Sequence, residues 1–196
     1  MKIGLFFGSF NPLHNGHLIL AQGILNESDL QQVWFVLTPQ NPQKRKEQLL
    51  ADQDRLTMLR EALYESTDFR VCEIEFRLNP PYYTSITLTH LKDHYPEHEF
   101  SLIVGEDNLR GLASWFNYEY ILRNYRLLVY PRAMQKNERP NTKPPIPGAQ
   151  ITHLSQLCVL PMSSSYIRRL VQQKKSIKYL VPETVERTIQ DRRFYH

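Results

Sequence analysis

The chain has little cysteine and no long apolar run, and each absence excludes a class of protein. Its two cysteines, Cys72 and Cys158, are too few and too far apart for a disulfide framework. The first apolar run is broken at Gly8-Ser9, which is too early for the core of a signal peptide, and no later run approaches the length of a membrane span. We therefore expect a cytoplasmic protein with no membrane partner.

Two common nucleotide-binding signatures are also missing. The glycine turn near the N-terminus is neither a G-x-G-x-x-G dinucleotide fingerprint nor a G-x-x-x-x-G-K-[ST] P-loop. No internal repeat and no sign of a second domain is present. The chain of 196 residues is long enough to bury a sizeable core, so we expect one domain over residues 1–196.

The charge of the chain is mildly positive and unevenly distributed. The formal net charge is +4, and eight Lys or Arg residues against three Asp or Glu residues follow from Arg168 onward. This balance suits an anionic small ligand and is also compatible with nucleic acid. Charge alone does not decide between these partners.

The first seventeen residues carry the most informative pattern. Ile3–Phe7 is a short apolar run typical of a buried parallel strand, and Gly8-Ser9 ends it. An apolar-periodic segment over 18–25 then predicts a helix, with His14 and His17 at its start. Backbone N–H groups and the positive end of the helix dipole converge at such a turn, which favours phosphate binding. Imidazole N–H groups can donate to phosphate oxygens, and a protonated imidazole adds charge.

Three interpretations of the histidine pair stay open on spacing alone. His14 and His17 could be surface residues, half of a zinc site, or ligands of a phosphate. No cysteine lies near them, which weakens the zinc interpretation. The strand–turn–helix context favours phosphate, and we expect no protein-bound metal site.

Predicted strands and helices alternate along the rest of the chain, and this alternation indicates a three-layer α/β fold. Residues 3–7 and 33–37 flank a helix, which predicts parallel pairing with a right-handed crossover. A basic loop over 43–46 follows, and a proline-rich exposed loop is expected over 131–148. Further strands are predicted at 69–76, 100–104, 126–130 and at 151 onward, with 159–160 also reaching the sheet. Helices are predicted at 52–64, 84–94, 108–112, 118–124, 166–173 and 182–192.

A second helix start near the C-terminus repeats the logic of the first. Ser163-Ser164-Ser165 supplies hydroxyl and N–H groups, and Arg168 lies about one turn further on. A serine N-cap with a surface arginine is a common arrangement and is the simpler interpretation of this segment alone. Two phosphate-suited helix starts in one chain favour a shared anion site.

These two segments resemble the signatures of the nucleotidylyltransferase superfamily. Gly8-Ser9-Phe10-Asn11-Pro12-x-His14-x-Gly16-His17 is similar to its (T/S)-x-x-x-H-x-G-H signature, and Met162-Ser-Ser-Ser-Tyr-Ile-Arg168 to its C-terminal Ile-Ser-Ser-Thr-x-Ile-Arg signature. The superfamily transfers a nucleotidyl group from ATP or CTP to a phosphate and releases pyrophosphate. The resemblance implies a three-layer Rossmann-like fold with a mainly parallel sheet.

The middle of the chain narrows the resemblance to bacterial nicotinate-nucleotide adenylyltransferase. The segments at 81–88, at 103–109 and at Trp115-Phe116 are similar to its Ser-Tyr-Thr-x-x-Thr-Leu, Gly-x-Asp-x-Leu and Trp-Tyr segments. The segment at 39–44 is similar to its Pro-x-x-x-Pro-His-Lys loop. The chain departs from the family pattern at four positions: Asn11 for Asp, Gln43 for His, Phe116 for Tyr, and Ser165 for Thr.

The resemblance implies a reaction of nicotinate mononucleotide with ATP, giving nicotinate adenine dinucleotide and pyrophosphate in NAD biosynthesis. The implied catalytic residues are His14, His17, Lys44 and Arg168. The implied ATP-binding residues are Gly8, Ser9, Phe10, His17, Gly105, Asp107, Ser164, Ser165 and Arg168. The implied nicotinate mononucleotide-binding residues are Ser9, Lys44, Thr84, Trp115 and Phe116. Mg²⁺ is expected to accompany ATP and to bridge phosphate oxygens mostly through water and the substrate.

Several alternatives remain at this point. Asp107 could be a helix cap, and Trp115 and Tyr83 could serve only in packing. The acceptor could be phosphopantetheine or nicotinamide mononucleotide, as in related adenylyltransferases. A non-catalytic nucleotide- or nucleic-acid-binding module is the alternative from another class, although we expect no nucleic-acid partner. The sequence leaves the oligomeric state open, a homo-oligomer included.

Overall fold

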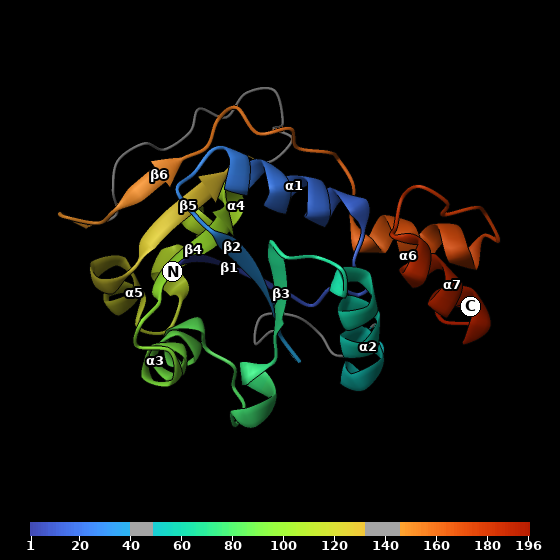
Figure 1. Cartoon of the computed structure of the whole chain (residues 1–196), viewed down its shortest axis with the longest axis horizontal. Helices are drawn as coiled ribbons and strands as arrows, with labels where there is room; N and C mark the ends of the chain where they lie inside the picture. Colours follow the sequence, from blue (N-terminus) through green and yellow to red (C-terminus); the bar gives the residue numbers. More distant parts are fainter. Residues whose placement is uncertain (40–48, 132–145) are drawn as a thin grey trace.

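A computed structural model describes residues 1–39, 49–131 and 146–196 of the chain (Figure 1). Its centre is a six-stranded sheet in which every neighbouring pair of strands is parallel. The strands are β1 (Lys2–Gly8), β2 (Gln32–Leu37), β3 (Phe69–Cys72), β4 (Glu99–Gly105), β5 (Arg126–Tyr130) and β6 (Ile151–His153). Their order, β3-β2-β1-β4-β5-β6, is that of a doubly wound, Rossmann-like fold. The predicted three-layer α/β fold with a mainly parallel sheet is confirmed.

Helices cover both faces of the sheet, because alternate residues of each strand point to opposite sides. Phe6 of β1 joins one buried cluster, with α1 (Asn15–Asn26), α2 (Asp52–Leu63), α6 (Ser164–Gln172) and α7 (Glu183–Asp191). Ile3 and Leu5 join the other cluster, with α3 (Thr84–His94) and α5 (Tyr118–Asn124). In Figure 1, α1 accordingly lies across the sheet from α3 and α5.

The C-terminal helices return to the N-terminal half of the fold. The helix α7 packs against α2, and Figure 1 shows α6 and α7 beside α2 rather than beside β6, which precedes them. The N–H of Asn15 donates to the carbonyl oxygen of Leu180 at 2.9 Å, and the Asn15 side-chain amide donates to Tyr179 at 2.7 Å. The first and last thirds of the chain therefore meet at the start of α1.

Two predicted strands were too long. The strand predicted over 69–76 ends at Cys72, and Ile74–Arg77 forms a short 3-10 helix, η2. The reason is that β3 pairs with β2 only as far as Val36, so the chain beyond has no ladder and instead turns to bury Ile74 and Glu75. The strand β6 likewise ends at His153, and residues 159–160 form no strand.

Smaller differences concern helix ends and the loops. The short helix α4 covers Glu106–Arg110, two residues earlier than predicted, and a 3-10 turn, η3 (Leu112–Ser114), follows it. The predicted basic loop at 43–46 and most of the proline-rich loop at 131–148 lie outside the described residues. Cys72 and Cys158 are free thiols. Within the described ranges, no helix is both long and apolar enough to cross a membrane.

Candidate active site

The candidate site lies where the sheet reverses its winding, between β1 and β4. Connections leave these neighbouring strands toward opposite faces, and ligands of open α/β sheets bind at the carboxyl edge of such a switch point. Gly8 ends β1 and Gly105 ends β4, so both predicted glycines lie at this edge. The turn that follows β1 leads directly into α1, and the turn that follows β4 leads into α4.

The turn after β1 is tightly folded around Phe10. Phe10 has a positive φ of 40°, and its ring lies under Gly8. A Cβ on residue 8 would lie 2.8 Å from the Phe10 ring, a separation that side chains do not tolerate. Glycine at position 8 therefore lets the Phe10 ring pack directly against the end of β1.

The two histidines form a stacked pair at the start of α1. Their ring centroids are 3.6 Å apart, with an interplanar angle of 20°. The backbone N–H of His14 donates to Nδ1 of His17 at 3.2 Å. Because Nδ1 accepts this bond, a neutral His17 carries its proton on Nε2, where it can donate to an anion. The ring of His17 is held by an edge contact with Phe10, with centroids 5.2 Å apart.

His14 is nearly buried, with 4% of its surface exposed. Burial lowers the pKa of His14 to about 4, partly offset by a backbone hydrogen bond. His14 is therefore neutral at pH 7 and offers a hydrogen-bond donor without a positive charge. This differs from the expectation that a protonated imidazole adds charge, and the reason is the desolvation of the ring.

The second helix start lies directly against the first turn. Ser163 caps α6 by accepting the N–H of Tyr166 at 3.2 Å. The Ser164 hydroxyl donates to the carbonyl oxygen of Pro12 at 2.9 Å. Arg168 donates through one nitrogen to the Asn11 carbonyl oxygen at 2.8 Å and through the other to the Ser165 hydroxyl at 3.2 Å. The structure thus brings the two helix starts, about 150 positions apart, into contact.

Two further predicted residues lie at the end of β4. A Cβ at Gly105 would lie 2.6 Å from a carboxylate oxygen of Asp107 and 3.2 Å from the Tyr130 ring, so a side chain there would displace the Asp107 carboxylate. Asp107 occupies the first turn of α4, whose N-cap residue is Gly105. A carboxylate in the first turn is stabilised by the helix dipole, so the helix-start interpretation and the ribose-binding interpretation of Asp107 both stay predictions.

The predicted acceptor residues form a separate, more open group. Thr84 is the first residue of α3, and Tyr83 precedes it as the N-cap. The rings of Tyr83 and Phe116 stack with centroids 4.6 Å apart, and 49% of Phe116 is exposed. Trp115 is partly buried and packs against the cluster that includes α3 and α5. Tyr83 is thus part of the aromatic surface, although the sequence left its role open.

One predicted catalytic residue cannot be placed. Lys44 belongs to the segment 40–48, which lies outside the described residues, as does Gln43. On either side of these residues, β2 ends at Leu37 beside Gly8, and the N–H of Leu50 donates to the side-chain oxygen of Asn11 at 3.3 Å.

Sequence reasoning missed Arg55, which is fully buried, with 0% exposed. Its five N–H groups match five acceptors: the carbonyl oxygens of Leu50 (3.1 Å), Ser9 (2.7 Å), Thr38 (3.1 Å) and Pro39 (2.7 Å), and the Asp52 carboxylate (2.6 Å). Arg55 therefore holds the turns after β1 and β2 together. An arginine in an amphipathic helix is typically exposed, so its sequence position gave no signal.

Glu75 was also missed, and it lies in the core in contact with α3. It is 1% exposed and accepts a hydrogen bond from the Thr87 hydroxyl of α3 at 2.7 Å. Burial raises the pKa of the Glu75 carboxyl to about 7, and the bond from Thr87 offsets part of that rise. The helix that begins at Thr84 thus contacts a buried carboxyl whose pKa is raised toward neutral pH.

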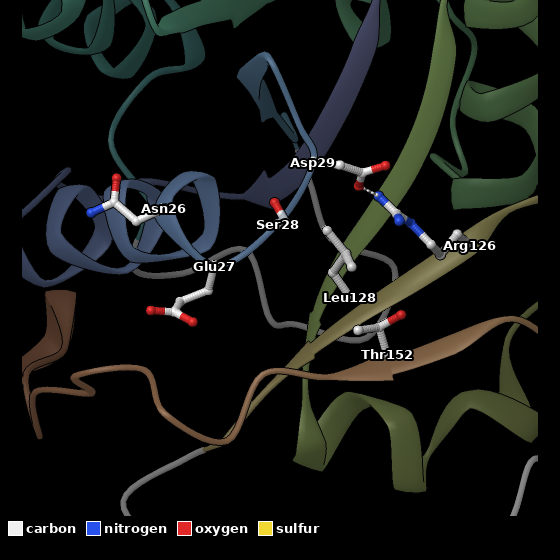
Figure 2. A pocket seen from close by; sticks show the side chains of 7 residues that line it. All are labelled: Asn26, Glu27, Ser28, Asp29, Arg126, Leu128 and Thr152. Carbon is white, nitrogen blue, oxygen red and sulfur yellow. Dashed lines mark hydrogen bonds and ion pairs between the residues drawn. The ribbon is translucent and has the colours of Figure 1, made fainter.

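A hollow of about 480 Å³ lies away from this site, between the end of α1 and the starts of β5 and β6 (Figure 2). In Figure 2, Asp29 reaches toward Arg126, and the two form an ion pair at 2.6 Å. The hollow lies at the amino ends of the strands, whereas both predicted helix starts lie at the carboxyl ends. None of the predicted site residues lines it.

Comparison with known proteins identifies the family of this chain. A family model described as cytidylyltransferase-like matches residues 5–170. The chain belongs to this family. Within the family, a "Probable nicotinate-nucleotide adenylyltransferase" of Cytophaga hutchinsonii is 46% identical over 199 residues, covering 100% of this chain and 98% of the relative. A protein of the same description from Flavobacterium johnsoniae is 46% identical over 195 residues, covering 100% and 99%. The resemblance to nicotinate-nucleotide adenylyltransferases is therefore confirmed.

The fold of the family is also seen in a solved structure. The structure of Plasmodium falciparum nicotinic acid mononucleotide adenylyltransferase complexed with NaAD matches with a TM-score of 0.76, covering 99% of this chain and 97% of that one. Its sequence is 18% identical to this chain, so the match supports the family fold and not individual contacts.

Proposed function

We propose that this chain transfers the adenylyl group of ATP to nicotinate mononucleotide, giving nicotinate adenine dinucleotide and pyrophosphate. The observation that carries the proposal is the pair of hydrogen bonds from Ser164 and Arg168, at the start of α6, to Pro12 and Asn11, in the turn that leads into His14 and His17. Such paired helix N-termini suit a polyanion. Full-length relatives at 46% identity that bear this activity in their names support the choice of substrates.

The chemistry needs placement and charge stabilisation but no protein nucleophile. A phosphate oxygen of the mononucleotide forms a bond to the α-phosphorus of ATP, the bond from that phosphorus to the bridging oxygen breaks, and pyrophosphate leaves with the electron pair. The attacking phosphate is already anionic at pH 7, so no general base is required. This requirement matches a site built from N–H donors, hydroxyls and an arginine.

In this proposal, each side chain has a role that its environment allows. His17 donates from Nε2 to phosphate oxygens, because its Nδ1 accepts the His14 N–H. His14 acts as a neutral donor, since burial keeps its pKa near 4. Arg168 supplies positive charge near the leaving pyrophosphate, with Ser164, Ser165 and the Gly8–Phe10 backbone as further donors.

The remaining predicted residues complete the two substrate subsites. We assign adenosine to the β4 end, where Asp107 can accept from ribose hydroxyls, and the pyridine ring to the Phe116 and Trp115 surface beside Thr84. Lys44 is assigned to phosphate charge from the segment after β2.

Mg²⁺ enters this reaction with ATP. In the parts of the chain that the structure describes, no three His, Cys, Asp or Glu side chains gather in a way that could hold a metal ion. We infer that phosphate oxygens and water hold the ion, which is the usual arrangement for Mg²⁺ with a nucleotide. The protein's part is to hold the phosphates that carry it.

Pyrophosphate release tests the proposal directly. The protein is incubated with Mg-ATP and, in separate reactions, with nicotinate mononucleotide, nicotinamide mononucleotide or phosphopantetheine. We expect release with nicotinate mononucleotide at the highest kcat/KM and formation of nicotinate adenine dinucleotide. Release only with phosphopantetheine would favour that acceptor, and no release with any acceptor would refute adenylyl transfer.

A further inference from the structure

The last turn of the chain returns to the turn that follows β1. The hydroxyl of Tyr195 donates to the side-chain oxygen of Asn11 at 2.8 Å, across 184 positions of sequence. Asn11 is 1% exposed, and the Tyr195 ring packs against the same cluster as Phe10 and Ile167. This partly buried, long-range bond between two side chains is a specific constraint, because the buried Asn11 oxygen cannot exchange its partner for water without cost.

Asn11 also accepts two other hydrogen bonds from residues near the site. The same side-chain oxygen accepts the Leu50 N–H, from the residues just before α2, at 3.3 Å. The Asn11 carbonyl oxygen accepts Arg168 at 2.8 Å. The orientation of residue 11 therefore sets where the guanidinium of Arg168 lies relative to the Gly8–Phe10 turn.

The Tyr195 hydroxyl is suited to a permanent donor role. Burial raises the pKa of Tyr195 well above its ordinary value, while the nearby charges of Arg168 and Arg55 oppose part of that rise. The proton therefore stays on the hydroxyl throughout the neutral range. An Asp at position 11, as in the family pattern, could accept the same bond, so the arrangement does not depend on the amide.

We propose that Tyr195 is a positioning residue for adenylyl transfer, which fixes Asn11 and, through it, Arg168 against the phosphate turn. Tyr195 does not contact the substrate in this scheme. The inference rests on the proposed function, and it predicts that a side chain one position from the C-terminal residue controls the phosphate subsite but not the acceptor subsite. A merely structural tyrosine would affect stability and leave the balance between these subsites unchanged.

The test compares Tyr195→Phe with wild type in kcat, in KM for nicotinate mononucleotide, and in the Kd of Mg-ATP from titration calorimetry. Phenylalanine keeps the ring and removes only the hydroxyl. We expect kcat to fall by about tenfold and the Mg-ATP Kd to rise by several-fold, with KM for the acceptor unchanged, because a small displacement at a reacting phosphate is costly. An unchanged kcat and Kd would overturn the proposal.

Tyr125→Phe is the matched control. It also removes a buried tyrosine hydroxyl, one that donates to the Leu88 carbonyl oxygen at 3.2 Å, far in sequence from the phosphate turn. We expect it to shift Tm without weakening Mg-ATP binding. Equal weakening of Mg-ATP binding in both variants would show that the effect is general loosening and would overturn the positioning role.

A double-mutant cycle with Asn11→Ala tests the route through Asn11. If Tyr195 acts through this residue, Tyr195→Phe should lower kcat by about tenfold in the wild-type background and by less than about twofold in the Asn11→Ala background. If the losses of kcat from the two substitutions multiply in full, Tyr195 does not act through Asn11. If Asn11→Ala does not fold, Asn11→Asp replaces it, and Tyr195→Phe should then retain its full cost.

The calorimetric measurement separates this inference from the proposed function. If wild type releases no pyrophosphate, adenylyl transfer is refuted, and the Mg-ATP Kd of Tyr195→Phe still decides the positioning role: several-fold weaker binding supports it and equal binding overturns it. A wild-type protein that does not bind Mg-ATP at all would overturn both.

Discussion

The phosphate side and the acceptor side of the candidate site are held in different ways. On the phosphate side, the buried side chains of Arg55 and Asn11 and the partly buried Ser164 fix the turns by hydrogen bonds to backbone groups. On the acceptor side, Phe116 is about half exposed and is placed mainly by stacking on Tyr83. Hydrogen bonds at short range impose direction, whereas stacked rings can slide and separate. We infer that the phosphate side is preorganised and the acceptor side adapts.

The strongest test of this contrast is to remove the buried guanidinium on the phosphate side. Arg55→Leu leaves four carbonyl oxygens and the Asp52 carboxylate without their shared donor. We expect the free energy of unfolding, measured by urea denaturation, to fall by about 3–5 kcal/mol. Arg60→Leu is the control, because Arg60 pairs with Glu73 in a half-exposed bridge and should cost about 1 kcal/mol or less. Equal losses of unfolding free energy in the two variants would contradict a preorganised phosphate side.

Removing a phosphate donor should affect turnover without affecting folding. His17→Ala is expected to lower kcat by about 10²–10³-fold, the usual cost of losing one donor to developing charge, with Tm little changed. The matched control is His94→Ala, an exposed histidine on α3. Near-normal turnover in His17→Ala, measured by pyrophosphate release, would show that the assigned role is wrong.

The free energy of unfolding of the protein should depend on pH through Glu75, which contacts α3. Burial raises its pKa from 4.5 to about 7, so between these values the folded state keeps a proton that the unfolded state loses. Stability from this group is therefore full below pH 4.5 and is lost as pH rises to 7, by about 1–3 kcal/mol. His14 acts in the opposite direction, since burial lowers its pKa to about 4.

Glu75→Gln isolates this contribution, because His14 is unchanged in the variant. Urea unfolding of both proteins from pH 4.5 to 8 should give a difference in stability that grows with pH in favour of the variant and levels off above 7. A difference that does not vary with pH would show that Glu75 keeps its ordinary pKa.

The smallest expected effect comes from the exposed aromatic ring. Phe116→Ala should raise KM for nicotinate mononucleotide by about tenfold and leave the Mg-ATP Kd unchanged, because it removes one stacking surface. Phe116→Tyr should keep the wild-type KM, and Tyr64→Ala, an exposed ring at the end of α2, is the control. A larger effect of Phe116→Ala on Mg-ATP than on the acceptor would contradict the division into two subsites.

The elements that sequence reasoning predicted well are those with a strong local signal. The run Ile3–Phe7 and the serines at 163–165 predicted the ends of β1 and the cap of α6, and these two signatures led to one site. The strand predicted at 69–76 was too long because its alternation continues past the last residue with a partner strand. Local pattern cannot show where a neighbouring strand stops.

The functional residues that the sequence did not predict were missed for a different reason. Arg55 and Glu75 lie in ordinary polar positions of the sequence, and their roles come from contacts with Ser9, Thr38 and Thr87 that only the folded chain brings together. Tyr195 is likewise defined by Asn11 at the other end of the chain. Polar groups that act through long-range contacts leave little trace in periodicity or spacing.

The central claim is that the helix starts of α1 and α6 act as one phosphate-binding unit. A double-mutant cycle of His17→Ala and Arg168→Ala on kcat, measured by pyrophosphate release, tests it most directly, with Arg169→Ala as the exposed neighbouring control. Residues that act as a unit give strongly non-additive losses. The account predicts a double variant within about tenfold of the worse single variant, whereas losses that multiply in full would show that the two helix starts act independently.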